Sequence, residues 1–184
     1  EDLRPGLLTS PMAHQQAAMR FCWSRFAAQQ RGAALLMEQG TGKTLVTIAL
    51  ANALHYQHAI RWALVLVPNS LRGTWANPDL GEIAKHSRDE HVVIVPEGTR
   101  EARIASIEAA LAGRRATDPL LWVVLNYDTL ALDARRPTNP GAQLVRRLRE
   151  AVRLGPPGLL VCDESTALKS GTANRTRAVQ EIAD

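Results

Sequence analysis

The stretch that decides the fold reads AALLMEQGTGKT over residues 33–44 and is followed by LVTIALANAL over residues 45–54. A short apolar run, a glycine-rich turn and a helical sequence follow one another here. Such glycines let backbone N–H groups turn around phosphate oxygens, and the start of a helix favours an anion. A lysine for the terminal phosphates and a hydroxyl for Mg2+ complete the pattern. The stretch therefore predicts a strand, a phosphate-binding loop of the Walker type and a helix.

The loop contains every group that phosphate binding requires. Gly40 and Gly42 supply the turn, and Lys43 supplies the cation. Met37 stands where the strict Walker pattern has glycine, so the match is to the shorter GxGKT form. The alternative, a chance GTGKT in a glycine turn, is disfavoured by the strand–loop–helix context. The predicted nucleotide contacts in the loop are Gln39, Gly40, Thr41, Gly42, Lys43 and Thr44, with Lys43 also catalytic and Thr44 also a Mg2+ ligand.

The rest of the chain repeats the order of strand and helix. Each apolar run is short, rich in Val and Leu, and continuous, which is typical of strands buried on both faces of a parallel sheet. The sequence therefore predicts an α/β domain with a mostly parallel central sheet flanked by helices. The expected strands are 33–37, 62–67, 91–95, 120–125 and 158–162, and the expected helices are 11–30, 43–57, 71–86, 99–113, 141–154 and 172–183.

Length and composition exclude several other classes of protein. A chain of 184 residues with 46% hydrophobic and 22% charged residues fits a single globular domain. It has no run near the ~20 apolar residues that span a bilayer and no signal-peptide features, so we expect a cytoplasmic protein without a membrane partner. Two cysteines far apart, Cys22 and Cys162, suggest neither a disulfide framework nor a zinc site. The net charge of +4 favours a polyanionic partner.

An acidic pair, Asp163-Glu164, follows the last expected strand. Ligands of parallel sheets bind beyond the carboxyl ends of the strands, which is where this pair and the phosphate loop belong. Nucleotide hydrolysis needs one carboxylate to hold Mg2+ through water and another to orient or deprotonate the attacking water. We assign Asp163 to the first role and Glu164 to the second, catalytic role. Taken alone, such a pair is equally explained as solvated turn residues or helix caps.

Five segments in order along the chain resemble the superfamily 2 helicases and translocases, and within them the Swi/Snf-like ATPases. MEQGTGKT is similar to their motif I, and LVLVPNSLRGTW is similar to motif Ia. VVLNYDTL resembles the segment that ends in Tyr-Asp/Glu-Thr-Leu, and LLVCDESTALKSGTANRTRAV resembles motif II. SPMAHQQAAMRF resembles the glutamine motif, which implies that Gln15 reads the adenine edge of the nucleotide.

Three spacings carry the Swi/Snf-like part of the resemblance. They are the Pro-x-x-Leu-x-x-x-Trp pattern that ends at Trp75, the run YDTL over 127–130, and Lys169 six positions after Asp163. The acidic motif reads Asp-Glu-Ser-Thr where many members have Asp-Glu-Ala-His. This departure places the chain nearer to bacterial or phage relatives than to chromatin remodellers.

The resemblance implies a function and its partners. Residues 1–184 are expected to form the N-terminal RecA-like ATP-binding lobe of a DNA translocase or helicase-like ATPase, ending before motif III. ATP and Mg2+ are the implied cofactors, and double-stranded DNA and a C-terminal lobe outside this chain are the implied partners. Without the arginine finger of that lobe, the fragment is expected to be nearly inactive. The alternatives are a P-loop NTPase that does not act on nucleic acid and a non-catalytic nucleotide-binding scaffold.

The resemblance also implies DNA contacts after two strands. Ser70 and Arg72 follow the second expected strand, and Asn126 and Tyr127 follow the fourth. Two simpler readings stay open: Ser70 caps the helix expected at 71–86, and Arg72 is a solvated residue of its first turn. Trp75 is interpreted as packed on the sheet, with base stacking as the alternative. The arginine-rich stretch 135–153 forms either a phosphate-facing stripe or a solvated helix face.

Overall fold

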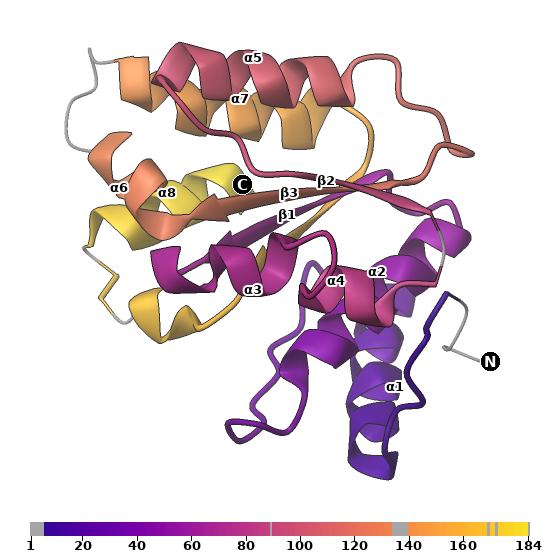
Figure 1. The fold of residues 1–184 in the computed structure, drawn as a ribbon. Helices are drawn as coiled ribbons and strands as arrows, with labels where there is room; N and C mark the ends of the chain where they lie inside the picture. The colour runs from indigo at the N-terminus through magenta and orange to yellow at the C-terminus, as the bar shows by residue number, and fades with distance from the viewer. Residues whose placement is uncertain (1–5, 89, 134–139, 169, 172, 184) are drawn as a thin grey trace.

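Strand β1 (Trp62–Val67) lies inside a four-stranded sheet whose order is β2-β3-β1-β4 (Figure 1). The computed structural model describes residues 6–88, 90–133, 140–168, 170–171 and 173–183, and each neighbouring pair of strands in this sheet is parallel. The other strands are β2 (His91–Ile94), β3 (Leu120–Asn126) and β4 (Gly158–Cys162). The α/β fold with a parallel sheet that the sequence predicts is confirmed.

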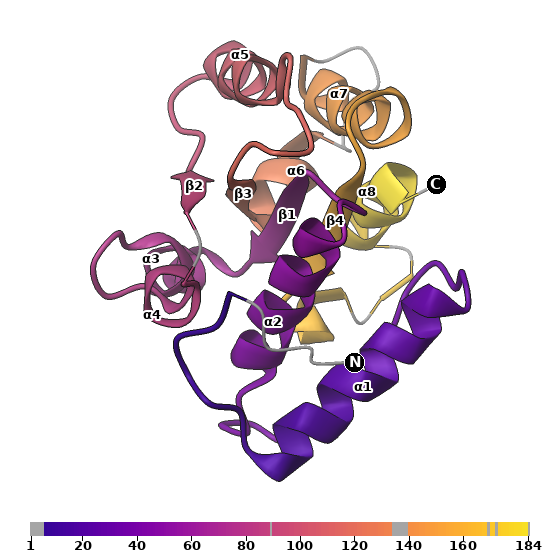
Figure 2. The ribbon, with the colours of Figure 1, turned by 90° about the vertical axis from the view of Figure 1, so that its right-hand side faces the viewer.

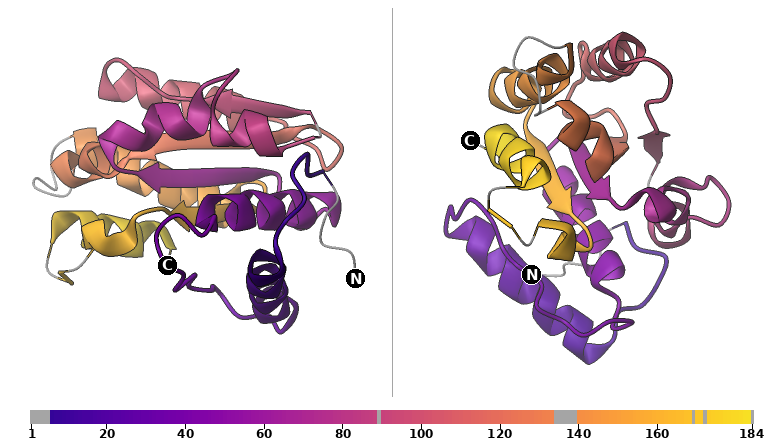
Figure 3. Two further views of the ribbon diagram at one scale, coloured as in Figure 1. Left: turned by 60° about the horizontal axis from the view of Figure 1, so that its bottom comes forward. Right: turned by 90° about the vertical axis from the view of Figure 1, so that its left-hand side faces the viewer.

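Helices cover both faces of the sheet (Figures 2 and 3). On one face lie α2 (Lys43–Tyr56), α3 (Arg72–Ala76) and α4 (Glu82–His86), and α1 (Ala13–Ala27) packs against α2. On the other face lie α5 (Arg100–Leu111), α6 (Tyr127–Asp133), α7 (Pro140–Leu154) and α8 (Asn174–Ala183). Two short 3-10 helices, η1 (Asn69–Leu71) and η2 (Ser165–Leu168), follow β1 and β4. In the part of the chain that the structure describes, we find no helix with the length and apolar character to cross a bilayer.

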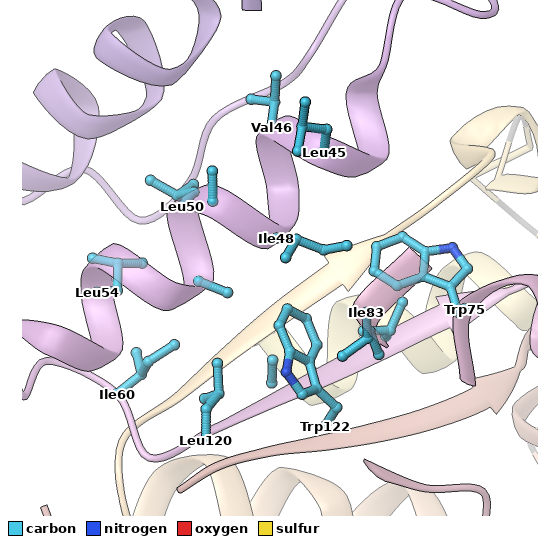
Figure 4. Close-up of a cluster of buried hydrophobic side chains, with 14 of the residues drawn as sticks. Leu45, Val46, Ile48, Leu50, Leu54, Ile60, Trp75, Ile83, Leu120 and Trp122 are labelled. Carbon is cyan, nitrogen blue, oxygen red and sulfur yellow. The ribbon is translucent and has the colours of Figure 1, made fainter. Parts of the chain in front are cut away.

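The sheet separates two hydrophobic clusters. The odd-numbered residues of β1 face a cluster with α2, Trp75 and Ile83, and the even-numbered residues face a cluster with α5, α6, α7 and α8. Figure 4 shows the first cluster, in which side chains of α2 lie over the sheet beside Trp75 and Trp122. Every residue of β1 is at most 1% exposed. Burial on both faces explains why this strand has a continuous apolar sequence instead of an alternating one.

The strand expected at 33–37 is wrong, because these residues form an irregular segment before α2. Leu36 is 96% exposed, whereas Leu35 and Met37 pack against the cluster that contains α2. A strand satisfies its backbone groups by pairing with a neighbour, and no described segment forms a ladder with 33–37. The apolar run therefore marks partial packing on the core and not a place in the sheet.

The single helix expected over 71–86 is also wrong, because this segment is divided into the end of η1, α3 and α4. Asn77 has an extended backbone (φ −59°, ψ 127°), as expected for a residue before proline. Its Oδ1 accepts hydrogen bonds from the backbone N–H groups of Asp79 and Leu80 at 2.9 and 2.8 Å. A Cβ on Gly81 would lie only 2.5 Å from the carbonyl oxygen of Asn77. Proline and this tight turn end α3 after five residues.

Replacing Gly158 with alanine is expected to destabilise the sheet. Its Cβ would lie 2.5 Å from Nε1 of Trp62, and that indole is anchored by a 2.8 Å hydrogen bond to the carbonyl oxygen of Pro156. Overpacking of this kind costs about 1–3 kcal/mol in the free energy of unfolding. Urea denaturation should show such a loss for Gly158→Ala. Gly32→Ala is the control, since its Cβ meets nothing within 4 Å. Equal losses in both variants would contradict the prediction.

Candidate active site

The carboxyl ends of β1, β3 and β4 lie level with one another. Val67 pairs with Asn126, and Leu66 pairs with Cys162. Asp163 continues the second ladder, because its backbone N–H donates to the carbonyl oxygen of Leu66 at 3.0 Å. The segments that follow these three strands are therefore brought together at one edge of the sheet.

Asp163, directly after β4, forms hydrogen bonds with the segments that follow β1 and β3. Its Oδ2 accepts a 2.7 Å hydrogen bond from Nε1 of Trp75 in α3, and its Oδ1 accepts a 2.9 Å hydrogen bond from the backbone N–H of Glu164. Its backbone carbonyl accepts a 2.8 Å hydrogen bond from the hydroxyl of Tyr127, the first residue of α6. Both carboxylate oxygens thus have a protein donor, and the orientation of the side chain is defined by its surroundings.

Glu164 turns away from the sheet edge with an unusual backbone. Its φ of +48° lies in the left-handed region, which side chains other than glycine rarely adopt. Strained backbone of this kind is found preferentially at functional sites. The turn leaves Glu164 exposed while Asp163 is half-buried. The two carboxylates of the pair therefore have different surroundings, as two different roles require.

The phosphate loop has the backbone that its glycines predict. Gly40 and Gly42 have φ values of +76° and +85°, both in the left-handed region. Helix α2 begins at Lys43 and has 14 residues. Within the described residues, its N-terminus has neither a side-chain cap nor an acidic residue in the first turn. The first backbone N–H groups of α2 are therefore available to an anion.

The direction of α2 places this N-terminus at the carboxyl edge of the sheet. In Figure 4, Leu45 near the start of α2 lies toward Trp75, whereas Leu54 near its end lies beside Ile60, which precedes β1. Because Trp75 contacts Asp163, the start of α2 and the acidic pair belong to the same edge. This direction is the one that the expected juxtaposition of loop and acidic pair requires.

Lys43 is held by the loop itself. Its Nζ donates to the carbonyl oxygens of Met37 at 3.1 Å and of Glu38 at 2.9 Å. The hydroxyl of Thr41 donates to the same Glu38 carbonyl at 2.6 Å. The two remaining loop candidates differ in burial, since Gln39 is exposed and Thr44 is half-buried. The ammonium group of Lys43 thus lies across the loop and binds its carbonyl oxygens, while the N–H groups of the same loop would bind a phosphate.

Gln15 lies against the phosphate loop and is 7% exposed. Its Nε2 donates to the carbonyl oxygen of Thr41 at 3.0 Å, and its Oε1 accepts from the backbone N–H of Met12 at 2.9 Å. Nε2 of His14 donates to the same Thr41 carbonyl at 3.1 Å. The first turn of α1 therefore holds the loop through two hydrogen bonds to the Thr41 carbonyl. The adenine contact expected of Gln15 stays a prediction.

The oxygen donors at this edge fit Mg2+ bound together with a nucleotide. Among the described residues, no three His, Cys, Asp or Glu side chains gather into a metal site of their own. Mg2+ is usually held by one or two protein oxygens and by substrate phosphates. The hydroxyl of Thr44 and the carboxylate of Asp163 are donors of this kind. At Gly42 an added Cβ would lie 2.3 Å from Nε2 of Gln15, so this position of the loop has room only for backbone.

The four residues expected to contact DNA divide into two groups. Ser70 is exposed, and within the described residues α3 has no side-chain cap, so Ser70 does not cap it. Arg72 has 30% of its side chain exposed and lies 3.7 Å from a carboxylate oxygen of Glu97. Asn126 instead forms a hydrogen bond with Asn69 within the protein. Tyr127 is 2% exposed, and its hydroxyl donates to the backbone carbonyl of Asp163. The structure thus presents the first two to solvent and uses the last two internally.

Two of the four arginines of α7, Arg146 and Arg147, are paired with acidic side chains. Arg146 lies 3.7 Å from Glu150, and Arg147 lies 3.4 Å from Glu150 and 3.5 Å from Glu108 of α5. Leu144, Val145 and Leu148 are buried, as the helical pattern predicts. These pairs are what a solvated helix face shows, and the phosphate-facing stripe remains untested. Arg135, Arg136 and Lys169 lie outside the described residues.

Comparison with known proteins shows the family of this chain. Residues 14–184 match the SNF2-related domain family. This chain belongs to that family. The SNF2-related domain is 26% identical over 179 residues to the "DNA repair and recombination protein RAD54-like" of Gallus gallus. The alignment covers 92% of this chain and 22% of that relative, so the chain spans less than a quarter of the relative's length. The Swi/Snf-like resemblance of the motifs is confirmed, and the bacterial or phage type stays a prediction.

Sequence reasoning missed two contacts of this SNF2-related domain. Trp75 was interpreted as packing on the sheet, and it does so, but its indole also reaches Asp163. The Pro-x-x-Leu-x-x-x-Trp pattern after β1 is the signal that marks this tryptophan. Asn69 is the second, because its Oδ1 accepts a 2.9 Å hydrogen bond from Nδ2 of Asn126 and joins the segments after β1 and β3. No local pattern marks Asn69.

Alanine at Gly42 is expected to destabilise the SNF2-related domain more than alanine at Gly40. Both variants place a side chain in the left-handed region, which costs about 1–2 kcal/mol. At Gly40 the added Cβ meets nothing within 4 Å, whereas at Gly42 the side chain of Gln15 must also move. Urea denaturation measures both losses. The double variant Gln15→Ala, Gly42→Ala should recover the excess, and an excess that persists there would contradict the assigned clash.

Tyr127 gives the domain a pH-dependent stability. Burial is the main cause that raises the pKa of Tyr127 far above the ordinary value for tyrosine. Above about pH 10 the unfolded chain has lost this proton and the folded chain keeps it, so the free energy of unfolding falls as the pH rises. Denaturation curves at increasing pH should show this slope, and Tyr127→Phe should reduce it. Tyr56→Phe is the control, because the only other tyrosine, Tyr56, is 64% exposed. An unchanged slope in Tyr127→Phe would contradict the assignment.

Proposed function

We propose that this SNF2-related domain is the ATP-binding lobe of a DNA-dependent ATPase motor, which couples ATP hydrolysis to movement on duplex DNA when it is joined to a second lobe. The observation that carries the proposal is the meeting of a phosphate loop, with an uncapped helix N-terminus, and an acidic pair at one sheet edge. The membership of the family supports it.

The residues of the loop have distinct roles in this proposal. Backbone N–H groups from Gln39 to Thr44 surround the phosphates, because the left-handed glycines and the start of α2 turn them inward. Lys43 exchanges its contacts with loop carbonyls for the terminal phosphates. Gln15 holds the loop through Thr41 and presents its amide to adenine.

The acidic pair has a second set of roles. Mg2+, when bound, supplies charge neutralisation for the phosphates. Thr44 and Asp163 would hold it, Thr44 through its hydroxyl and Asp163 through water. The exposed carboxylate of Glu164 orients and deprotonates the attacking water. The hydrogen-bonded carboxylate of Asp163 suits a structural role, and the exposed side chain of Glu164 suits a proton-transfer role.

The DNA part of the proposal rests on the segment after β1. Ser70 and Arg72 are donors on the surface of η1 and α3, and a hydroxyl and a guanidinium suit phosphate oxygens. Asn126 and Tyr127 act indirectly, because Asn126 binds Asn69 in that segment and Tyr127 binds the carbonyl of Asp163 after β4. The printed name of the relative, a DNA repair and recombination protein, supports a DNA partner.

Nucleotide binding by residues 1–184 tests the first half of the proposal. We expect a fluorescent ATP analogue to bind in the presence of Mg2+ and to lose about 10- to 100-fold in affinity in Lys43→Ala, since charged hydrogen bonds are removed. Lys85→Ala is the matched control, because Lys85 is exposed and paired with Glu82 at 2.9 Å. Absence of binding, or an equal loss in both variants, would contradict the ATP site.

Hydrolysis with and without double-stranded DNA tests the second half. We expect little turnover by residues 1–184 alone, because an arginine finger from a second lobe contributes about 10³–10⁵ in rate. The natural protein that joins this domain to its second lobe should hydrolyse ATP faster with duplex DNA. Rapid turnover by the domain alone, or no response of the natural protein to DNA, would overturn this half.

A further inference from the structure

We propose that Trp75 is a positioning residue, which orients the carboxylate of Asp163 for Mg2+ through its indole N–H. The inference rests on the proposed function and adds to it a residue from a different segment of the chain. The two residues are 88 positions apart, and the hydrogen bond between Nε1 and Oδ2 is 2.7 Å long. Such a short bond to a carboxylate is of the charge-assisted kind, which is roughly twice as strong as a neutral one.

Packing fixes the indole before it meets the carboxylate. Trp75 is 2% exposed and belongs to the cluster that contains α2 and Ile83. Its ring centroid lies 6.3 Å from that of Trp122 of β3, at an interplanar angle of 46°. Figure 4 shows the ring of Trp75 beside the side chain of Ile48 of α2. A ring confined in this way cannot follow a rotating carboxylate, so it determines where Oδ2 lies.

The neighbouring tryptophan shows that burial alone does not demand this bond. Trp122 is 0% exposed in the same cluster, and its Nε1 has no hydrogen-bond partner among the described residues. The cluster therefore accommodates an indole whose N–H is unpaired. The bond from Trp75 to Asp163 is a feature of its place above the carboxyl edge of the sheet.

The remaining contacts of Asp163 complete the restraint. The backbone N–H of Glu164 binds Oδ1, the hydroxyl of Tyr127 binds the carbonyl, and the backbone N–H of Asp163 binds β1 at Leu66. Each carboxylate oxygen keeps a further lone pair for a water molecule. With Trp75 in place, those lone pairs have a fixed direction. Without it, Oδ2 is free to turn toward solvent and the water-binding geometry is lost.

The test measures the Mg2+ dependence of nucleotide binding. In Trp75→Phe, which keeps an aromatic ring and removes the N–H, we expect the Mg2+ concentration for half-maximal binding of a fluorescent ATP analogue to rise about tenfold, as for other partners of metal ligands. Binding of the same analogue in EDTA should stay as in the wild type. Trp122→Phe is the matched control, since it removes an indole N–H without a described partner from the same cluster, and it should leave the Mg2+ dependence unchanged.

A spectroscopic measurement on the wild-type chain does not depend on whether Trp75→Phe folds. The indole N–H resonance of Trp75 should shift when Mg2+ and nucleotide are added together, and not with nucleotide in EDTA. Trp62, whose indole donates to Pro156 before the start of β4, is the internal reference that should not shift. An unchanged Trp75 resonance on addition of Mg2+ and nucleotide would overturn the proposal.

The outcomes separate this inference from the proposed function. A wild-type chain that binds no nucleotide overturns both. A wild-type chain that binds nucleotide with Mg2+, together with an unchanged Mg2+ dependence in Trp75→Phe, overturns the inference and leaves the ATP site standing. An equal shift in Trp75→Phe and Trp122→Phe would assign the effect to packing and would also overturn it.

Discussion

The parallel pairing of β1 with neighbours on both sides is the constraint on which the rest of the structure depends. Because both ladders run in one direction, β1, β3 and β4 end together, and the carbonyl of Leu66 receives the N–H of Asp163 directly after β4. A slip of one residue in either ladder would turn every following side chain to the opposite face. The acidic pair would then point away from Trp75 and α2. The geometry of the site is therefore set by strand register and only refined by the loops.

Helix α3 connects the protein surface to the hydrophobic core. It has five residues, with Arg72 at its start on the surface and Trp75 in the core. The helix is short because Asn77 and the proline after it form a turn that ends it. One short helix therefore carries both the ion pair of Arg72 with Glu97 and the hydrogen bond of Trp75 to Asp163.

Much of the fold was predictable because its signals are local. Continuous apolar runs predict strands 62–67, 120–125 and 158–162, which the structure confirms, and the glycines of the predicted phosphate loop have a left-handed backbone. The run at 33–37 has the same composition but no described pairing partner, which composition cannot reveal. Helix α6 starts directly after β3 at Tyr127, and its local signal is Asn126, whose Oδ1 accepts a 2.7 Å hydrogen bond from the backbone N–H of Thr129. The contact between Trp75 and Asp163 spans 88 positions, so no local pattern contains it.

The contacts of Lys43 have a consequence for what the loop selects. Its ammonium group is already solvated by two carbonyl oxygens, of Met37 and Glu38, as an ion in water is solvated by its hydration shell. A ligand that binds Lys43 must replace these two carbonyl contacts. The net gain from Lys43 is therefore the energy of the new contacts minus the energy of the carbonyl contacts that are lost. If the loop binds a nucleotide as proposed, the charge of the polyphosphate would compensate for the lost carbonyl contacts of Lys43, and a neutral ligand would not.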